Sequence, residues 1–109
     1  MKYIPLFALA VLLVACSATT TQQSAGTQAD QVVSINNFKF SPATITVKVG
    51  QSVLWKNEDA ASHTVKIDDT ESPELFKGDA WTHTFSKAGT YAYSCGIHPS
   101  MKGTVVVEE

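Results

Sequence analysis

The chain contains no arginine and few charged side chains of either sign. Its 109 residues include eight basic and ten acidic side chains, so only 17% of the chain is charged and the net charge is -2. A nucleic-acid-binding surface needs clustered positive charge, which this composition does not supply. Nucleic acid is therefore not an expected partner. The length fits a single small domain.

Cysteine is also scarce, since Cys16 and Cys95 are the only two. Each lies in a local sequence that indicates a different use, so we predict no disulfide. Several enzyme motifs are missing, namely the G-x-S-x-G nucleophile turn, the H-E-x-x-H zinc pair and the glycine-rich phosphate loop. Asp59, Ser62 and His63 could form a catalytic triad by residue type, but they lie within five residues of one loop. We predict that the protein is not an enzyme.

The longest apolar run lies at the N-terminus, over residues 4–15. It is too short to span a bilayer comfortably and has the length of a signal-peptide core. The following segment, Leu-Val-Ala-Cys at 13–16, resembles the bacterial lipobox, in which the cysteine is lipidated and becomes the new N-terminus. Several acyl chains on one residue give stable membrane attachment. We predict a signal peptide over 1–15 and lipidation at Cys16, with a plain secretory signal cleaved near Ala18 as the alternative.

The next segment has no large apolar side chain and is rich in Ser, Thr, Gln and Ala. Such a segment cannot bury enough surface to order itself, so we expect a flexible tether over 16–31. A folded domain over 32–109 would then reorient above the membrane. Both signal interpretations export the protein, to the periplasm or cell envelope.

From residue 32 onward the chain reads as short β-strands, and helical periodicity is nowhere sustained. Ile45, Val47 and Val49 alternate with polar residues, which is typical of a half-buried strand. A turn at 50–51 leads into the next strand, which ends at Asn57. Later strands are expected over 63–67, 80–85, 90–95 and 103–107. Short strands without helices predict an all-β fold, an antiparallel two-sheet Greek-key β-sandwich.

Four further features of this domain carry expectations. The apolar positions on either side of 36–37 have opposite parity, so we expect a β-bulge there. Pro42 should end that strand, because proline cannot donate to the ladder. Residues 68–79 form the longest irregular stretch, and their acidic side chains fit either a solvated loop or a surface that orients a basic partner. His83 lies on an apolar strand face and is expected to be a half-buried, hydrogen-bonded structural histidine.

One loop sets a thiolate, an imidazole and a thioether at C-x2-H-x2-M spacing, in Cys95, His98 and Met101. His63 is available upstream as a fourth ligand. Thiolate and thioether are soft donors suited to Cu(I), and imidazole suits both copper states, so this is the composition of an electron-transfer copper centre. Zinc is the main competing metal, but a methionine argues against it. Two loops at one end of the sandwich would bring His63 to Cys95.

Residues 32–107 resemble the cupredoxin family, particularly its small plastocyanin-like and amicyanin-like members. The two-residue gap between His98 and Met101 resembles amicyanin. The motifs that carry the resemblance are Phe38-x-Phe40-x-Pro42, Val49-Gly50-x-x-Val53-x-Trp55-x-Asn57, His63, and Gly89-x-Tyr91-x-Tyr93-x-Cys95-x-x-His98-Pro99-x-Met101-x-Gly103.

The resemblance implies one type 1 copper ion, with His63, Cys95 and His98 in a near-trigonal plane and Met101 as a long axial ligand. It also implies one-electron shuttling between exported redox proteins. Expected partners are a c-type cytochrome, a periplasmic dehydrogenase or a copper reductase, and the protein itself is expected to be a monomer. The alternatives are a copper carrier of the cell envelope and a metal-free interaction sandwich.

Two residues are expected beside the ligands, Thr64 and Pro99. Relatives typically carry Asn at the position of Thr64, where it ties the two ligand loops together and its backbone N–H donates to the cysteine sulfur. A threonine can still offer the backbone N–H, but its side chain is shorter, which affects the tuning of the redox potential. Pro99, with Ile97, is expected to form an apolar rim around His98.

Overall fold

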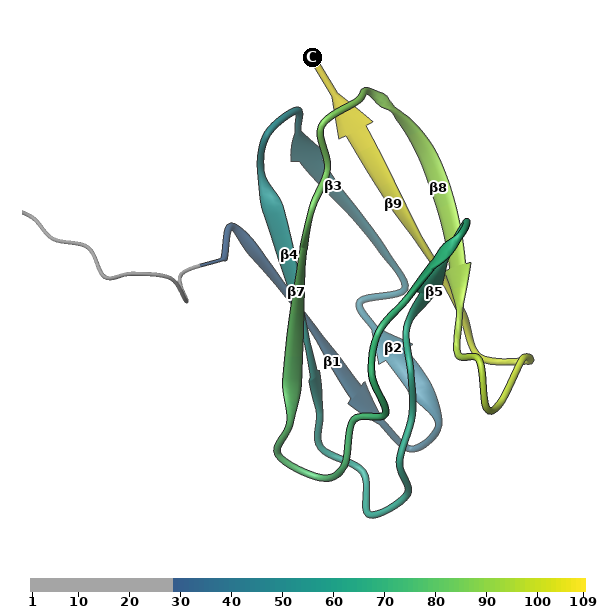
Figure 1. Ribbon diagram of the computed structural model, residues 1–109. Coiled ribbons are helices and arrows are strands. Elements are labelled where there is room, and N and C mark those ends of the chain that lie inside the picture. The colour runs from purple at the N-terminus through teal and green to yellow at the C-terminus, as the bar shows by residue number, and fades with distance from the viewer. Residues whose placement is uncertain (1–28) are drawn as a thin grey trace, which may run out of the picture.

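The computed structural model describes residues 29–109, which form two β-sheets packed face to face (Figure 1). The predicted signal peptide, the lipidation site Cys16 and most of the predicted tether lie outside these described residues. Within residues 29–109, no helix is long and apolar enough to cross a membrane. The first strand begins at Gln31, one residue before the predicted start of the domain.

The first sheet has the strand order β2-β1-β4-β7. Its strands are β1 (Gln31–Asn36), β2 (Lys39–Ser41), β4 (Ser52–Asn57) and β7 (Ala80–Thr84). Pro42 follows β2 directly, as predicted. Along β4 the side chains of Val53, Trp55 and Asn57 are buried while the residues between them are more exposed. This alternation is what a strand with one face on a core requires.

The second sheet has the strand order β3-β9-β8-β5-β6. Its strands are β3 (Thr44–Lys48), β9 (Lys102–Glu108), β8 (Gly89–Ser94), β5 (Lys66–Ile67) and β6 (Thr70–Glu71). The longest pairing joins β8 to β9 over six residue pairs, from Gly89 opposite Val107 to Ser94 opposite Lys102. This pairing brings the end of β8 and the start of β9 to the same end of the sandwich (Figure 1).

The predicted all-β two-sheet sandwich is confirmed, but both sheets are mixed instead of purely antiparallel. β1 pairs with β4 in parallel, and β3 pairs with β9 in parallel. The chain crosses from one sheet to the other between β2 and β3 and returns for β4, so these neighbours are not joined by hairpins. Parallel neighbours need such crossovers, which alternation within each strand does not reveal.

Three local expectations differ from the structure. In place of the predicted bulge at 36–37, β1 and β2 form a hairpin whose two turn residues, Asn37 and Phe38, have φ of 53° and 58°. The predicted strand over 63–67 is a single bridge from His63 to Leu75 followed by the short β5. The predicted irregular stretch 68–79 contains β6. In each case pairing between segments decided the local conformation, in two tight hairpins and one bridge of twelve residues' separation.

The core is one cluster of apolar side chains drawn from both sheets. Trp55 is fully buried and packs edge-to-face against Tyr93, at a ring separation of 5.3 Å. Tyr93 in turn packs against Phe40 at 4.8 Å. Buried aromatic pairs of this kind contribute roughly 0.5–1.5 kcal/mol beyond the area that they bury. They fix the two sheets to each other two residues before Cys95.

The hydroxyl of Tyr93 is buried and has no hydrogen-bond partner among residues 29–109. Burial raises the pKa of Tyr93 to about 12, with the nearby indole N–H of Trp55 lowering it slightly. The ring lies over Gly103, the residue paired with it on β9, where a Cβ would overlap the phenol. The Tyr93 ring can therefore lie across β9 only because residue 103 is a glycine.

We expect the protein to lose stability as the pH rises above about 10, and we expect Tyr93→Phe to remove part of that loss. Between pH 10 and 12 the unfolded chain loses the phenol proton while the folded chain keeps it, so the free energy of unfolding falls by up to roughly 2–3 kcal/mol as pH rises. Urea unfolding at pH 7, 10 and 11.5 measures this, with Tyr91→Phe as the matched control. Equal alkaline slopes in the two variants would contradict the assignment.

Candidate metal centre

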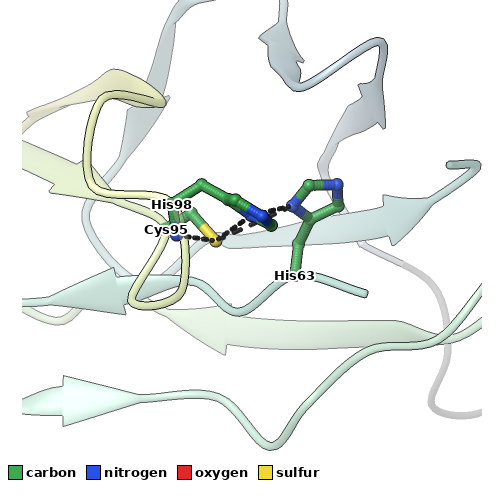
Figure 2. Close-up of side chains that lie close together, drawn as sticks. All are labelled: His63, Cys95 and His98. Carbon is green, nitrogen blue, oxygen red and sulfur yellow. Dashed lines mark hydrogen bonds between the residues drawn. The ribbon is translucent and has the colours of Figure 1, made fainter. Parts of the chain in front are cut away.

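Three side chains from two distant segments converge at one end of the sandwich (Figure 2). Cys95 follows β8 directly, His98 lies in the loop from β8 to β9, and His63 lies in the loop before β5. The Cys95 sulfur lies 3.7 Å from Nδ1 of His63 and 3.9 Å from Nδ1 of His98. The two imidazole nitrogens lie 3.2 Å apart. One ion placed between them would contact all three atoms.

The ring of His63 is held in one orientation by a carboxylate. Its Nε2 lies 2.8 Å from Oδ2 of Asp59, and its side chain is fully buried. An ionised carboxylate only accepts hydrogen bonds, so Nε2 carries the proton and donates it. In the neutral ring Nδ1 then carries a lone pair, which is available to a metal ion lying between it and the Cys95 sulfur.

The sulfur of Cys95 accepts two backbone hydrogen bonds. The N–H groups of Thr64 and His98 donate to it at 3.3 Å and 3.4 Å. Cys95 is fully buried and, among the described residues, is a free cysteine. Two N–H donors from different segments of the chain therefore hold the sulfur in place beside the two imidazoles.

The loop that carries His98 is closed by its own backbone. The N–H of Cys95 donates to the carbonyl of Met101 at 3.1 Å, and the N–H of Met101 donates to the carbonyl of His98 at 2.9 Å. Met101 is buried, with 5% of its surface exposed. The loop therefore brings a buried thioether to the same end of the sandwich as the three converging side chains.

Thr64 and Pro99 were both expected beside the ligands, and they differ in what they contact. The hydroxyl of Thr64 accepts a hydrogen bond from the N–H of Gly96 at 2.8 Å, so the side chain does tie the two loops together. The same hydroxyl donates to Oε2 of Glu71 at 2.7 Å, one of the acidic side chains of the stretch 68–79. Pro99 is exposed in the loop next to His98.

Asp59, like Glu71, has a supporting role beside the site that was not predicted from the sequence. Its carboxylate accepts hydrogen bonds from the N–H groups of Asn37 and Phe38 as well as from His63. Burial by itself raises the pKa of Asp59, but the Phe38 N–H, the His63 ring and the Asn37 N–H together hold that pKa below its usual value. The carboxylate thus compensates two left-handed turn residues and orients a candidate ligand. Its spacing of four residues before His63 was the available signal.

Phe38, at the tip of the β1–β2 hairpin, covers part of the site. Its ring stands edge-on to both imidazoles, at 5.3 Å from His63 and 5.1 Å from His98, and half of its surface is exposed. Ile97 is also exposed, at 44%. The exposed end of the candidate site is therefore apolar, and the buried end is polar.

His83 lies outside this cluster, as predicted. It is half-buried and stacks on Trp81 at 5.3 Å, with Phe85 edge-on at 4.8 Å. Burial lowers its pKa. Across residues 29–109 its ring makes these aromatic contacts and no hydrogen bond, so the hydrogen-bonding part of the expectation is wrong. Ring stacking replaces a polar partner here.

The spacing of the three donors fits a bound transition metal. With bonds of about 2.0–2.1 Å to nitrogen and about 2.3 Å to sulfur, a trigonal ion would set the nitrogens about 3.5 Å apart and each nitrogen about 3.8 Å from the sulfur. The observed separations are 3.2, 3.7 and 3.9 Å. Two imidazoles and a thiolate with a methionine nearby are the donors of electron-transfer copper sites.

Residues 6–107 match the family model of the cupredoxin-like domain. The chain belongs to the cupredoxin-like family. The chain is 35% identical to amicyanin-alpha of Methylorubrum extorquens, over 93% of this chain and 97% of that protein. It is 39% identical to amicyanin of Paracoccus denitrificans over 71% of this chain, and it spans 64% of that protein's length. A Cu(I) form of an amicyanin variant superposes with a TM-score of 0.71 at 39% identity, covering 74% of this chain and 84% of that one.

Membership of the cupredoxin family confirms several predictions at once. The fold is that of the amicyanin-like proteins, copper is the metal of the family, and its amicyanin-like members carry electrons and are not enzymes. The relatives do not favour the copper-carrier alternative.

We expect Asp59→Ala to destabilise the metal-free protein by about 1–3 kcal/mol, because two turn N–H groups and a buried imidazole lose their acceptor. Urea unfolding of the metal-free chain measures this. Asp69→Ala, which removes an acidic side chain from an exposed turn, is the matched control and should stay within about 0.5 kcal/mol of the parent. Equal midpoints for the two variants would show that Asp59 has no structural role.

Proposed function

We propose that this cupredoxin carries single electrons at a type 1 copper centre with His63, Cys95, His98 and Met101 as ligands. One observation carries the proposal, namely the convergence of two imidazole nitrogens and one sulfur within 3.2–3.9 Å of each other. The backbone hydrogen bonds of Met101 fix it at the end of the ligand loop, where its thioether would serve as the fourth ligand. Bound copper supplies a one-electron couple between Cu(I) and Cu(II).

The chain's own residues keep the ligand positions fixed. Asp59 orients His63, two N–H groups hold the Cys95 sulfur, and the Met101 carbonyl accepts the Cys95 N–H. Electron transfer is fast when the site rearranges little between the two oxidation states. A ligand loop that joins two paired strands and is closed by its own backbone hydrogen bonds meets that requirement, since packed strands resist displacement.

His98 is the proposed route for electrons into and out of the site. It is half-buried, whereas His63 and Cys95 are fully buried. Phe38, Ile97 and Pro99 are exposed around it and give this end an apolar surface. A small apolar contact suits redox partners that must dock and leave quickly. We propose as partners a c-type cytochrome, a periplasmic dehydrogenase or a copper reductase.

Burial of the ligands also argues against copper delivery. A carrier must exchange ligands with an acceptor, and the His63 ring and Cys95 sulfur have no exposed surface through which an incoming ligand could attack. This burial supports a protein that retains its copper through repeated redox cycles. A metal-free β-sandwich that only binds other proteins would not require a buried thiol facing two imidazole nitrogens, so the site also argues against that alternative.

We expect the purified protein to bind one Cu(II) and to develop an intense visible thiolate-to-copper band. Cys95→Ser should abolish the band, because an alcohol oxygen cannot supply the thiolate donor. Cys16→Ala is the matched control, since it removes the other cysteine and should leave the band unchanged. Titration followed by visible absorption measures both. A full band in Cys95→Ser, or none in the parent, would refute the proposed centre.

For location, relatedness to the amicyanins supports an exported protein. We propose further that the lipobox-like sequence at 13–16 leads to lipidation of Cys16, so that residues 16–31 tether the domain to a membrane of the cell envelope.

In cells, Cys16→Ala should therefore move the protein from the membrane fraction to the soluble fraction, because the acyl chains would have no attachment point. Fractionation followed by immunoblotting measures the distribution, with Cys95→Ser as the control that keeps Cys16. Unchanged membrane association of Cys16→Ala would refute the anchor.

A further inference from the structure

The hydroxyl of Thr64 joins three segments of the chain that lie apart in sequence. It accepts a hydrogen bond from the N–H of Gly96 at 2.8 Å and donates one to Oε2 of Glu71 at 2.7 Å. Thr64 precedes β5, Glu71 ends β6, and Gly96 follows Cys95. We refer to these two hydrogen bonds together as the hydroxyl bridge.

Glu71 determines which way the hydroxyl bridge runs. A hydroxyl has one proton and two lone pairs and rotates to suit its partners, whereas a carboxylate can only accept. The Thr64 proton is therefore directed at Glu71, which leaves a lone pair for the Gly96 N–H. In the absence of the carboxylate, the hydroxyl is free to rotate toward water or to other acceptors.

Thr64, which bears the hydroxyl, and Gly96, which the hydroxyl holds, both adjoin Cys95. The backbone N–H of Thr64 donates to that sulfur at 3.3 Å, and Gly96 is the next residue along the chain. The Glu71 carboxylate packs so closely over Gly96 that a Cβ at 96 would overlap it. Glu71 is exposed as a residue, but its carboxylate is packed against the ligand loop.

We propose that Glu71 is a positioning residue for the Cys95 ligand, acting through the Thr64 hydroxyl. It fixes the hydroxyl as an acceptor, which holds the Gly96 N–H and the Thr64 backbone in place around the sulfur. Its negative charge also favours the more positive, oxidised state of the centre. The effect on potential rests on the proposed copper function, whereas the hydrogen bonds exist in the metal-free chain.

Amide hydrogen exchange at Gly96 in the metal-free protein tests the bridge directly. Glu71→Ala and Thr64→Val should each speed exchange of this amide by about two- to tenfold, the range expected for loss of one hydrogen bond. Asp69→Ala, which removes an acidic residue from the turn between β5 and β6, should leave the rate unchanged. An unchanged rate in Glu71→Ala would overturn the proposal.

A second variant separates coupling from general loosening of the loop. In Thr64→Asn the side-chain amide oxygen can only accept, so it can hold the Gly96 N–H without Glu71. Adding Glu71→Ala to Thr64→Asn should then leave Gly96 exchange nearly unchanged. An equal acceleration in the presence and absence of Thr64→Asn would show that Glu71 does not act through the hydroxyl, and the proposal would be wrong.

The reduction potential of the copper-loaded protein provides the functional readout. Glu71→Gln keeps an acceptor oxygen but removes the charge, so the ratio of Cu(I) to Cu(II) affinity should rise about two- to tenfold, a potential increase of about 20–60 mV at about 59 mV per tenfold. Asp69→Asn should shift the potential less. Equal shifts of the potential in Glu71→Gln and Asp69→Asn would show that Glu71 acts only through its contribution to the net charge, and its specific role would be overturned. If the parent gave no visible copper band, the proposed function would fail while the exchange result would still decide the bridge.

Discussion

The antiparallel pairing of β8 with β9 is the constraint on which the rest of this site depends. It runs without interruption to Ser94 opposite Lys102, and the next backbone hydrogen bond joins Cys95 to Met101. The residues between them must therefore form a short closed loop with a cysteine at one end and a methionine at the other. His98 lies inside this loop, so three of the four proposed ligands are placed by one strand pair and its closing bonds.

The fourth proposed ligand, His63, comes from the loop between β4 and β5, and two carboxylates connect this loop to its neighbours. Asp59 links the His63 ring to the β1–β2 turn, and Glu71 links Thr64 to the loop that follows Cys95. Each carboxylate adds side-chain hydrogen bonding at a point where backbone N–H groups already connect the two segments, at Glu58 to Ile35 and at Thr64 to Cys95. A buried or half-buried hydrogen bond to a charged acceptor is stronger than a neutral one, so these contacts are suited to fixing ligand positions.

The exposed and buried parts of the site have different compositions for a physical reason. The Cys95 sulfur accepts hydrogen bonds from two backbone N–H groups and is shielded from water, because Cys95 is fully buried just after the end of β8. The solvent-facing side needs a surface from which a partner can separate. Phe38 and Ile97 provide an apolar surface there, and the Asp59 hydrogen bonds hold the Phe38 turn in its left-handed conformation.

The sequence by itself determined the donor types, their spacing and the strand character of the domain. These are local properties: alternation along a strand such as 44–48 and the C-x2-H-x2-M run can be read from neighbouring residues. Only the tertiary structure decided the parallel pairings β1–β4 and β3–β9, the turn at Asn37, and the roles of Asp59 and Glu71. The two parallel pairings depend on how the chain crosses between the sheets, and the roles of the two carboxylates depend on where the loop before His63 and the β5–β6 hairpin lie. Such placement comes from contacts between segments far apart along the chain, for which residue order gives no distance.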